Sequence, residues 1–137
     1  MTKITALLIM VLFLFSNCTK VKKNTANDYP EVKTLSARLL PNGSVQVTGQ
    51  IVHAGAGEIL YAGVCFDTTK MPDMLANQTL TDTIIGDSFS CVYPLSYFDI
   101  FKTYNFRAWA VNQNGYAMGS PIALSNISLS QSDIPCD

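Results

Sequence analysis

Histidine is the scarcest of the residues that carry chemistry in this chain, because His53 is the one histidine among 137 residues. Metal centres and nucleophile–base pairs commonly use imidazole, so most of them are hard to assemble here. Charged residues are also few, at 14% with a net charge of −1. The basic residues form no face or long run, which argues against a nucleic-acid partner. Hydrophobic residues, in contrast, make up 48%, enough for the core of one domain.

Two further motif classes are missing. No D-x-D run of acidic ligands occurs, so a calcium loop is not expected. Residues 54–57 contain G-x-G, but Leu60 stands where a dinucleotide fingerprint needs glycine. The aspartates that fall in expected loops are interpreted as turn residues bonding their own backbone: Asp67, Asp73, Asp82 and Asp87. We therefore expect no enzyme, no metal and no cofactor.

The N-terminus carries the longest apolar run. Lys3 precedes residues 4–15, in which only Thr5 is polar. Twelve residues are too few to cross a bilayer, which takes about 20. The layout is that of a secretory signal peptide, which we assign to residues 1–17.

The end of that run, Leu14-Phe-Ser-Asn-Cys18, resembles the lipobox of bacterial lipoproteins. The resemblance implies that the signal is removed before Cys18, that its sulfur is diacylated with palmitate-type chains, and that its new amine is acylated. Asn17 departs from the Gly, Ala or Ser usual before that cysteine. The alternatives are an ordinary signal peptide with a chance cysteine and an uncleaved anchor helix.

Residues 18–30 are interpreted as the lipidated cysteine and a flexible polar tether. Three lysines lie close to the expected lipid: Lys20, Lys22 and Lys23. Either they contact the membrane, where each would add about 1 kcal/mol of binding free energy on an anionic surface, or they belong to a solvated linker. Residue 19 is Thr rather than the Asp of inner-membrane retention signals. The expected location is therefore the outer membrane, with its periplasmic and surface faces both open.

The remaining chain shows period-two alternation typical of strands. Tyr104, Phe106, Ala108 and Ala110 share one face of the clearest segment, which ends in the turn residues 112–115. Other expected strands are residues 32–40, 44–53, 58–67, 88–93 and 116–128, with a short edge strand near 83–85. About seven strands and no helical pattern indicate a single antiparallel β-sandwich over residues 31–129, followed by a tail, 130–137.

The pattern Tyr104-x-Phe-x-Ala-x-Ala-Val-Asn-x-x-Gly115 resembles the F strand and following turn of fibronectin type III domains. The resemblance implies an immunoglobulin-like, fibronectin type III-like sandwich. It also implies that Tyr104 forms a tyrosine corner, with its hydroxyl bonded to upstream backbone. Phe98 stands where that family often has leucine. The resemblance says nothing about a ligand.

Strand phase places individual side chains. It directs Cys91 inward and Cys65 outward, so Cys136 on the tail could reach Cys65; the alternative is that these three thiols stay reduced. Arg107 and Trp109 are directed outward with Tyr61. These three residues form a candidate binding patch, or else ordinary cross-strand pairs.

The sequence thus predicts a membrane-anchored, non-catalytic envelope lipoprotein whose sandwich is a protein-interaction or structural module. The alternative is glycan binding through exposed aromatic residues, Tyr61, Tyr97, Trp109 and Tyr116. The expected partners are the membrane, through the lipid anchor, and an envelope protein or glycan.

Overall fold

The computed structural model describes residues 28–81, 83–125 and 127. The predicted signal peptide, Cys18 and the tail with Cys136 lie outside the described residues, so those assignments stay predictions.

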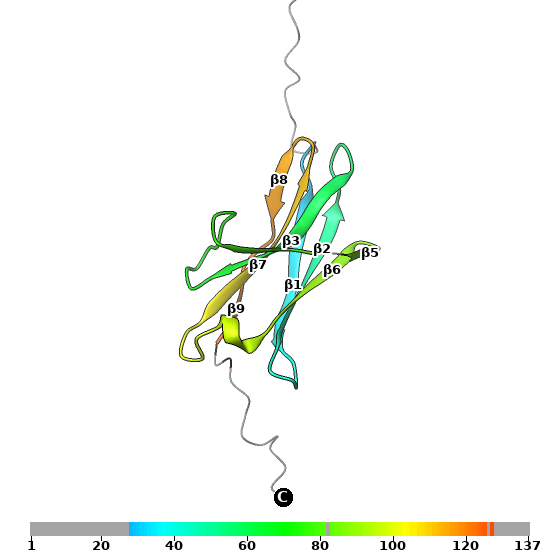
Figure 1. Ribbon diagram of the computed structural model, residues 1–137. Coiled ribbons are helices and arrows are strands. Elements are labelled where there is room, and N and C mark those ends of the chain that lie inside the picture. Colours follow the sequence, from blue (N-terminus) through cyan, green and yellow to red (C-terminus); the bar gives the residue numbers. More distant parts are fainter. Residues whose placement is uncertain (1–27, 82, 126, 128–137) are drawn as a thin grey trace, which may run out of the picture.

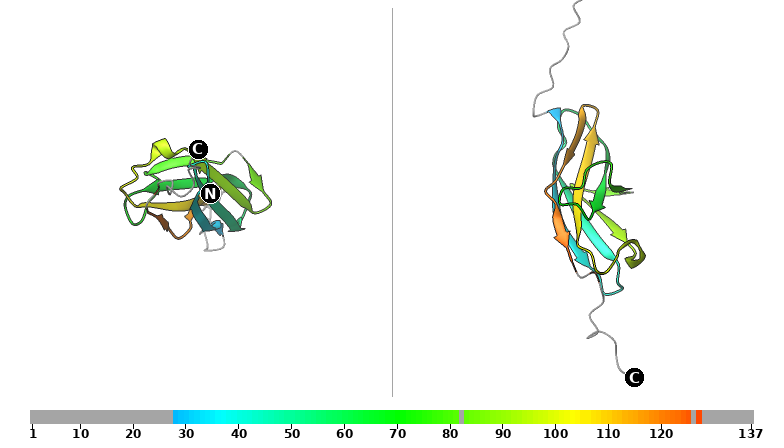
Figure 2. Two further views of the ribbon diagram at one scale, coloured as in Figure 1. Left: turned by 90° about the horizontal axis from the view of Figure 1, so that it is seen from below. Right: turned by 90° about the vertical axis from the view of Figure 1, so that its left-hand side faces the viewer.

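The chain folds into two antiparallel sheets packed face to face, an all-β sandwich as expected (Figures 1 and 2). One sheet has the order β1-β2-β6-β5, and the other has β4-β3-β7-β8, with β9 also paired to β7. The strands are β1 (Glu31–Leu39), β2 (Val45–His53), β3 (Ile59–Asp67), β4 (Asn77–Leu80), β5 (Ile84–Ile85), β6 (Ser88–Tyr93), β7 (Tyr104–Asn112), β8 (Gly115–Met118) and β9 (Ile122–Leu124). One 3-10 turn, Leu95–Tyr97, lies between β6 and β7.

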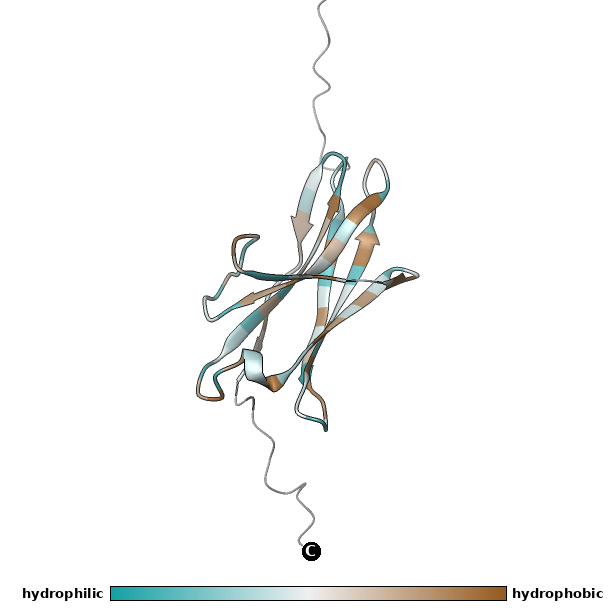
Figure 3. Ribbon diagram, in the orientation of Figure 1, coloured by the Kyte–Doolittle hydropathy of each residue, from teal (hydrophilic) through white to brown (hydrophobic). Residues whose placement is uncertain are grey.

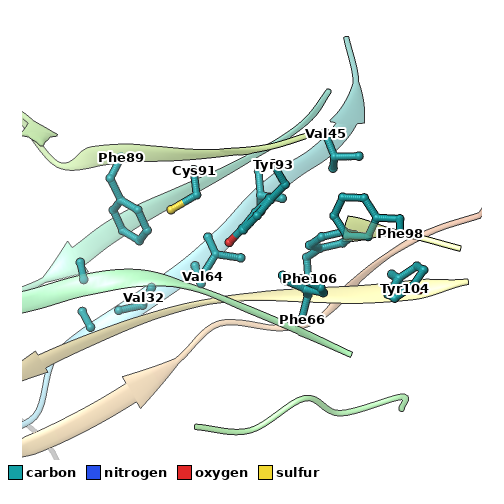
Figure 4. Close-up of a cluster of buried hydrophobic side chains, with 14 of the residues drawn as sticks. Val32, Val45, Val64, Phe66, Phe89, Cys91, Tyr93, Phe98, Tyr104 and Phe106 are labelled. Atoms are coloured by element: carbon teal, nitrogen blue, oxygen red, sulfur yellow. The ribbon is translucent and has the colours of Figure 1, made fainter. Parts of the chain in front are cut away.

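Alternation explains the core. In β2 every second residue from Val45 to Ile51 is buried, and in β7 every second residue from Tyr104 to Ala110 is buried. Figure 4 shows these side chains from both sheets pointing toward one another. The ring of Phe66 lies 5.2 Å from that of Phe98, which in turn lies 5.1 Å from that of Tyr104. The predicted inward faces of β2, β6 and β7 are therefore confirmed.

Nine strands form among the described residues, rather than about seven. Strand β4 was missed because Asn77–Leu80 is short and polar, and it is held at an edge by pairing with β3. The last predicted strand is split. Strand β8 pairs with the end of β7 and β9 with its start, and residues 119–121 between them include Pro121, which has no N–H for a ladder.

Two register shifts also change the expected faces. One lies between Thr34 and Ser36 in β1, and the other between Ile59 and Tyr61 in β3. Leu60, which the alternation of its strand directed inward, is exposed beside one of these shifts, and Leu35 is exposed beside the other. A bulge inserts one residue, so the side chain there no longer follows the alternation of its strand.

Three residues of the predicted tether pack against the sandwich. Residues 28–30 were assigned to the tether, but Pro30 is buried, and the backbone oxygen of Asp28 accepts a hydrogen bond from Asn112 Nδ2 at 2.8 Å. At the other end of the described chain, Ile127 is buried in the core. The packed unit therefore includes residues 28–30.

Candidate functional site

The outer face of the second sheet carries the predicted binding patch. Cross-strand register places Tyr61, Val111 and Tyr116 in one row over β3, β7 and β8. The next row holds Gly63, Trp109 and Met118. Tyr61 and Trp109 therefore share a face, as the alternation predicted.

Trp109 is nevertheless not exposed. Its exposed fraction is 3%, so the expectation of an accessible indole is wrong. The neighbouring Gly63 has no side chain, and a Cβ placed there would lie 2.9 Å from Cζ2 of the indole. Trp109 thus covers the space that the glycine leaves on β3. Among the described residues its indole N–H has no hydrogen-bond acceptor.

Arg107 has a structural task on the same face. Its Nε donates to the Gly119 oxygen at 2.7 Å, and its Nη1 donates to the Pro72 oxygen at 2.9 Å. Pro72 is fully buried in the loop after β3, so the guanidinium holds that loop against the sheet. Of the three predicted patch residues only Tyr61 is exposed, at 59%. The structure therefore does not assemble Tyr61, Arg107 and Trp109 into one accessible patch.

The two cysteines among the described residues are both buried, at different places in the sandwich. Cys91 lies in the inter-sheet core as predicted, and Cys65 points away from it, opposite Arg107. Cys65 is nonetheless fully buried, and burial raises the pKa of its thiol to about 11. A disulfide from Cys136 to Cys65 would therefore require the residues that bury Cys65 to move first.

A second exposed surface lies where the sequence predicted only one exposed aromatic residue, Tyr97. The loop between β6 and β7, residues 95–102, here called the distal loop, presents Tyr97, Ile100 and Phe101 to solvent. Phe101 is 91% exposed. Figure 3 shows hydrophobic colour in this loop, at the end of the sandwich opposite the β7–β8 turn. Three neighbouring apolar side chains exposed in one loop form a patch, and it is a contiguous patch rather than a single exposed residue that marks an interaction surface.

Hydrogen bonds hold the distal loop in place. The Asp99 N–H donates to the Tyr104 hydroxyl at 3.0 Å, the upstream backbone bond that the resemblance implied. The Phe101 N–H donates to Asp99 Oδ1 at 3.0 Å, and this bond lowers the pKa of the Asp99 carboxyl. Lys102 lies 3.4 Å from the same carboxylate. The exposed phenylalanine therefore sits on an ordered turn rather than on a loose one.

Three further titratable side chains accept backbone hydrogen bonds in turns. The Gly55 N–H donates to His53 Nδ1 at 2.8 Å, and the Thr68 N–H donates to Asp67 Oδ1 at 2.7 Å. Asp73 accepts the Leu75 N–H in the same way, at 2.8 Å. Residues 28–81, 83–125 and 127 contain no group of three or more His, Cys, Asp or Glu that could hold a metal ion. In that part of the chain no helix is long and apolar enough to cross a bilayer.

At the opposite end from the distal loop, Asn112 joins three segments. Its Nδ2 donates to the oxygens of Asp28 and Ala54, and its Oδ1 accepts the N–H groups of Asn114 and Gly115. The sequence indicated a turn here but not that the asparagine side chain is buried and fixes the N-terminal segment.

No protein-family model matches the chain, and no curated protein matches its sequence, so the functional argument rests on these residues alone.

Proposed function

We propose that this chain is a non-catalytic lipoprotein of the cell envelope, anchored in the outer membrane by acyl chains on Cys18, whose β-sandwich binds another envelope protein. The support for the anchor is the apolar run of residues 4–15 followed by Cys18. Three acyl chains exceed the two-signal requirement for stable anchoring.

The strand order supports a fibronectin type III-like domain. The sheets β1-β2-β6-β5 and β3-β7-β8 correspond to the A-B-E-D and C-F-G orders of immunoglobulin-like sandwiches. The bond from Asp99 to the Tyr104 hydroxyl supports the same assignment. Sandwiches of this type serve many functions, so the role must be argued from the surface.

The observation that carries the proposed interaction is Phe101 on the ordered distal loop. Rigid, exposed aromatic residues with apolar neighbours are the usual anchors of protein interfaces, because they lose little entropy on binding and bury a large area. Phe101 is nearly fully exposed, its loop is hydrogen bonded through Asp99, and Tyr97 and Ile100 extend the apolar surface.

Glycan binding is less well supported. The expected platform of four aromatic residues does not come together, because Trp109 is buried. Tyr97 follows β6 and precedes the start of β7, whereas Tyr61 and Tyr116 pair with Val111 near the end of β7. A single sugar chain would therefore meet two of the four rings on one face.

Two experiments test the proposal. Metabolic labelling with a fatty-acid analogue should mark the wild-type chain but not Cys18→Ala, and persistent labelling of that variant would contradict the anchor. For the interaction, the full-length protein should capture a partner from envelope extracts. Phe101→Ser should abolish the capture.

The matched control is Leu75→Ser, because Leu75 is 94% exposed but lies in the loop after β3. Capture that survives Phe101→Ser, or that is lost equally in Leu75→Ser, would remove the distal loop as the binding surface. A glycan array run with the same proteins identifies sugar binding as the competing result.

A further inference from the structure

The end of the sandwich opposite the distal loop, here called the proximal end, is also apolar. It consists of the β2–β3 loop, the β7–β8 turn, the strand residues next to them and residues 28–31. The large hydrophobic side chains exposed there are Tyr29, Val52, Leu60, Tyr61 and Tyr116. Figure 3 shows the start of β3 among the most hydrophobic coloured segments of the ribbon. Tyr61 and Tyr116 are 59% and 58% exposed and flank Val111 on one face.

Hydrogen bonds fix where the N-terminal segment enters this end. The Asp28 oxygen accepts Asn112 Nδ2 at 2.8 Å, Asn114 Nδ2 at 3.1 Å and the Ala56 N–H at 3.2 Å. In addition, the Tyr29 ring lies against Gly115, where an added Cβ would be 2.7 Å from it. Whatever precedes Asp28 is therefore attached at the proximal end and not at the distal loop.

The length of chain before Asp28 limits how far this end can move from a lipid anchor. Nine residues separate Cys18 from Asp28. The ten steps from Cys18 to Asp28 span at most roughly 35 Å when fully extended. This reach is close to the length of the sandwich along β7, because a nine-residue strand is about 30 Å long. The proximal end is therefore held at high effective concentration at the membrane surface, where even a weak contact is populated.

The exposed residues suit the headgroup layer. Tyrosine combines an apolar ring with a hydroxyl and prefers the membrane interface, and aliphatic side chains such as Leu60 add buried area there. The acidic residues Glu31 and Glu58 are exposed at the same end, whereas Lys20, Lys22 and Lys23 lie in the chain before it, so an anionic surface would repel one set of charges and attract the other. The chemistry fits a zwitterionic phospholipid surface.

We propose that the proximal end, through Leu60, Tyr61 and Tyr116, rests on the headgroup layer of a phospholipid bilayer and so orients the distal loop away from the membrane. This inference rests on the proposed function, because it requires the anchor at Cys18. The contact acts with the acyl chains and is too small to hold an unanchored chain on a membrane.

Trp109, the one tryptophan of the chain, reports on this contact. It lies one row from Tyr61 and Tyr116 on the same face, roughly 7 Å away along β7. The acylated full-length protein is reconstituted into phosphatidylcholine vesicles with or without a nitroxide on the headgroup. We expect the nitroxide to quench Trp109 emission.

Variants separate the ends of the molecule. Tyr61→Ser with Tyr116→Ser should relieve the quenching, whereas Tyr97→Ser with Phe101→Ser should leave it unchanged. A long Gly/Ser insertion before Asp28 leaves the sandwich intact and should also reduce quenching, because the effective concentration falls. Circular dichroism of each variant checks the fold.

Vesicle flotation distinguishes failure of the anchor from failure of the docking. If the wild-type chain floats, Cys18→Ala does not, and the quenching is absent or insensitive to Tyr61 and Tyr116, the anchor stands and the docking is overturned. If the wild-type chain does not float, both proposals fall. Binding of soluble oligosaccharides that depends on Tyr61 and Tyr116, without quenching by vesicles, would assign the face to glycans and overturn the docking.

Discussion

Removing one hydroxyl group, by Tyr104→Phe, should weaken the sandwich slightly and loosen the distal loop. The Tyr104 hydroxyl accepts the Asp99 N–H at 3.0 Å, while its ring packs 5.1 Å from the ring of Phe98. Phenylalanine keeps the ring contact and loses the bond. A typical net hydrogen bond contributes about 0.5–1.5 kcal/mol, so the free energy of unfolding should fall by about 1 kcal/mol.

This loss is large enough to measure. For a domain of about 100 residues, about 1 kcal/mol lowers Tm by roughly 4–8 °C. In chemical denaturation the midpoint should fall while the slope m stays constant, because the surface exposed on unfolding does not change. Tyr104→Ala also removes the ring and should cost about 3–5 kcal/mol through the cavity it leaves. Tyr97→Phe is the matched control, since Tyr97 is exposed and should lose almost nothing.

The same substitution should change one backbone amide in particular. The Asp99 N–H loses its acceptor in Tyr104→Phe, so its hydrogen exchange should accelerate. The Phe101 N–H keeps the carboxylate of Asp99 and should accelerate less. If Tyr104→Phe has the stability of the wild type and the Asp99 amide exchanges as slowly as before, the reasoning on the tyrosine corner is refuted.

Three further predictions concern the outer face of the second sheet. Gly63→Ala places a Cβ against the backbone oxygen of Thr79, so it should lower the free energy of unfolding by about 3 kcal/mol and shift the fluorescence of Trp109. The control is Gly86→Ala, which has φ 62° and open space around it and should lower that free energy by about 1 kcal/mol without changing the spectrum. Equal losses in the two variants would argue against close packing at Gly63. Trp109→Ala should cost about 3–5 kcal/mol in denaturant unfolding, and a loss below about 1 kcal/mol would contradict its burial. Burial raises the pKa of Cys65 to about 11. The stabilising contribution of the protonated thiol should therefore be complete below about pH 8.5 and disappear as the pH rises through 11. The free energies of unfolding of wild type and Cys65→Ala, measured from pH 8 to 11, should converge, and a constant difference would contradict the raised pKa.

The strands with clean alternation could be predicted from the sequence. In β2 and β7 every second residue is apolar or small, and a period of two has one structural interpretation. Strand β4 could not be predicted in this way. It has neither alternation nor β-branched enrichment, and it exists because the exposed edge of β3 offers backbone partners to Asn77–Leu80.

The candidate site was harder to predict, because burial on an outer face depends on residues distant in sequence. The alternation correctly separated Trp109 from Tyr104, but whether an outward side chain meets water is decided by what covers it. Gly63 leaves room for the indole, and Arg107 fastens the loop containing Pro72 onto the same sheet. Neither contact has a local sequence signal.

Strand β7 ties the two functional proposals together. Its first residue, Tyr104, holds Asp99 and hence the distal loop, and its last residue, Asn112, holds Asp28 and hence the point where the N-terminal segment joins. A nine-residue strand is about 30 Å long. Because both bonds start from one rigid strand, a membrane contact at the Asn112 end would fix the height and direction of Phe101 without any contact between the two ends. Loosening either end should therefore alter presentation of the distal loop to a partner while leaving lipid anchoring through Cys18 unchanged.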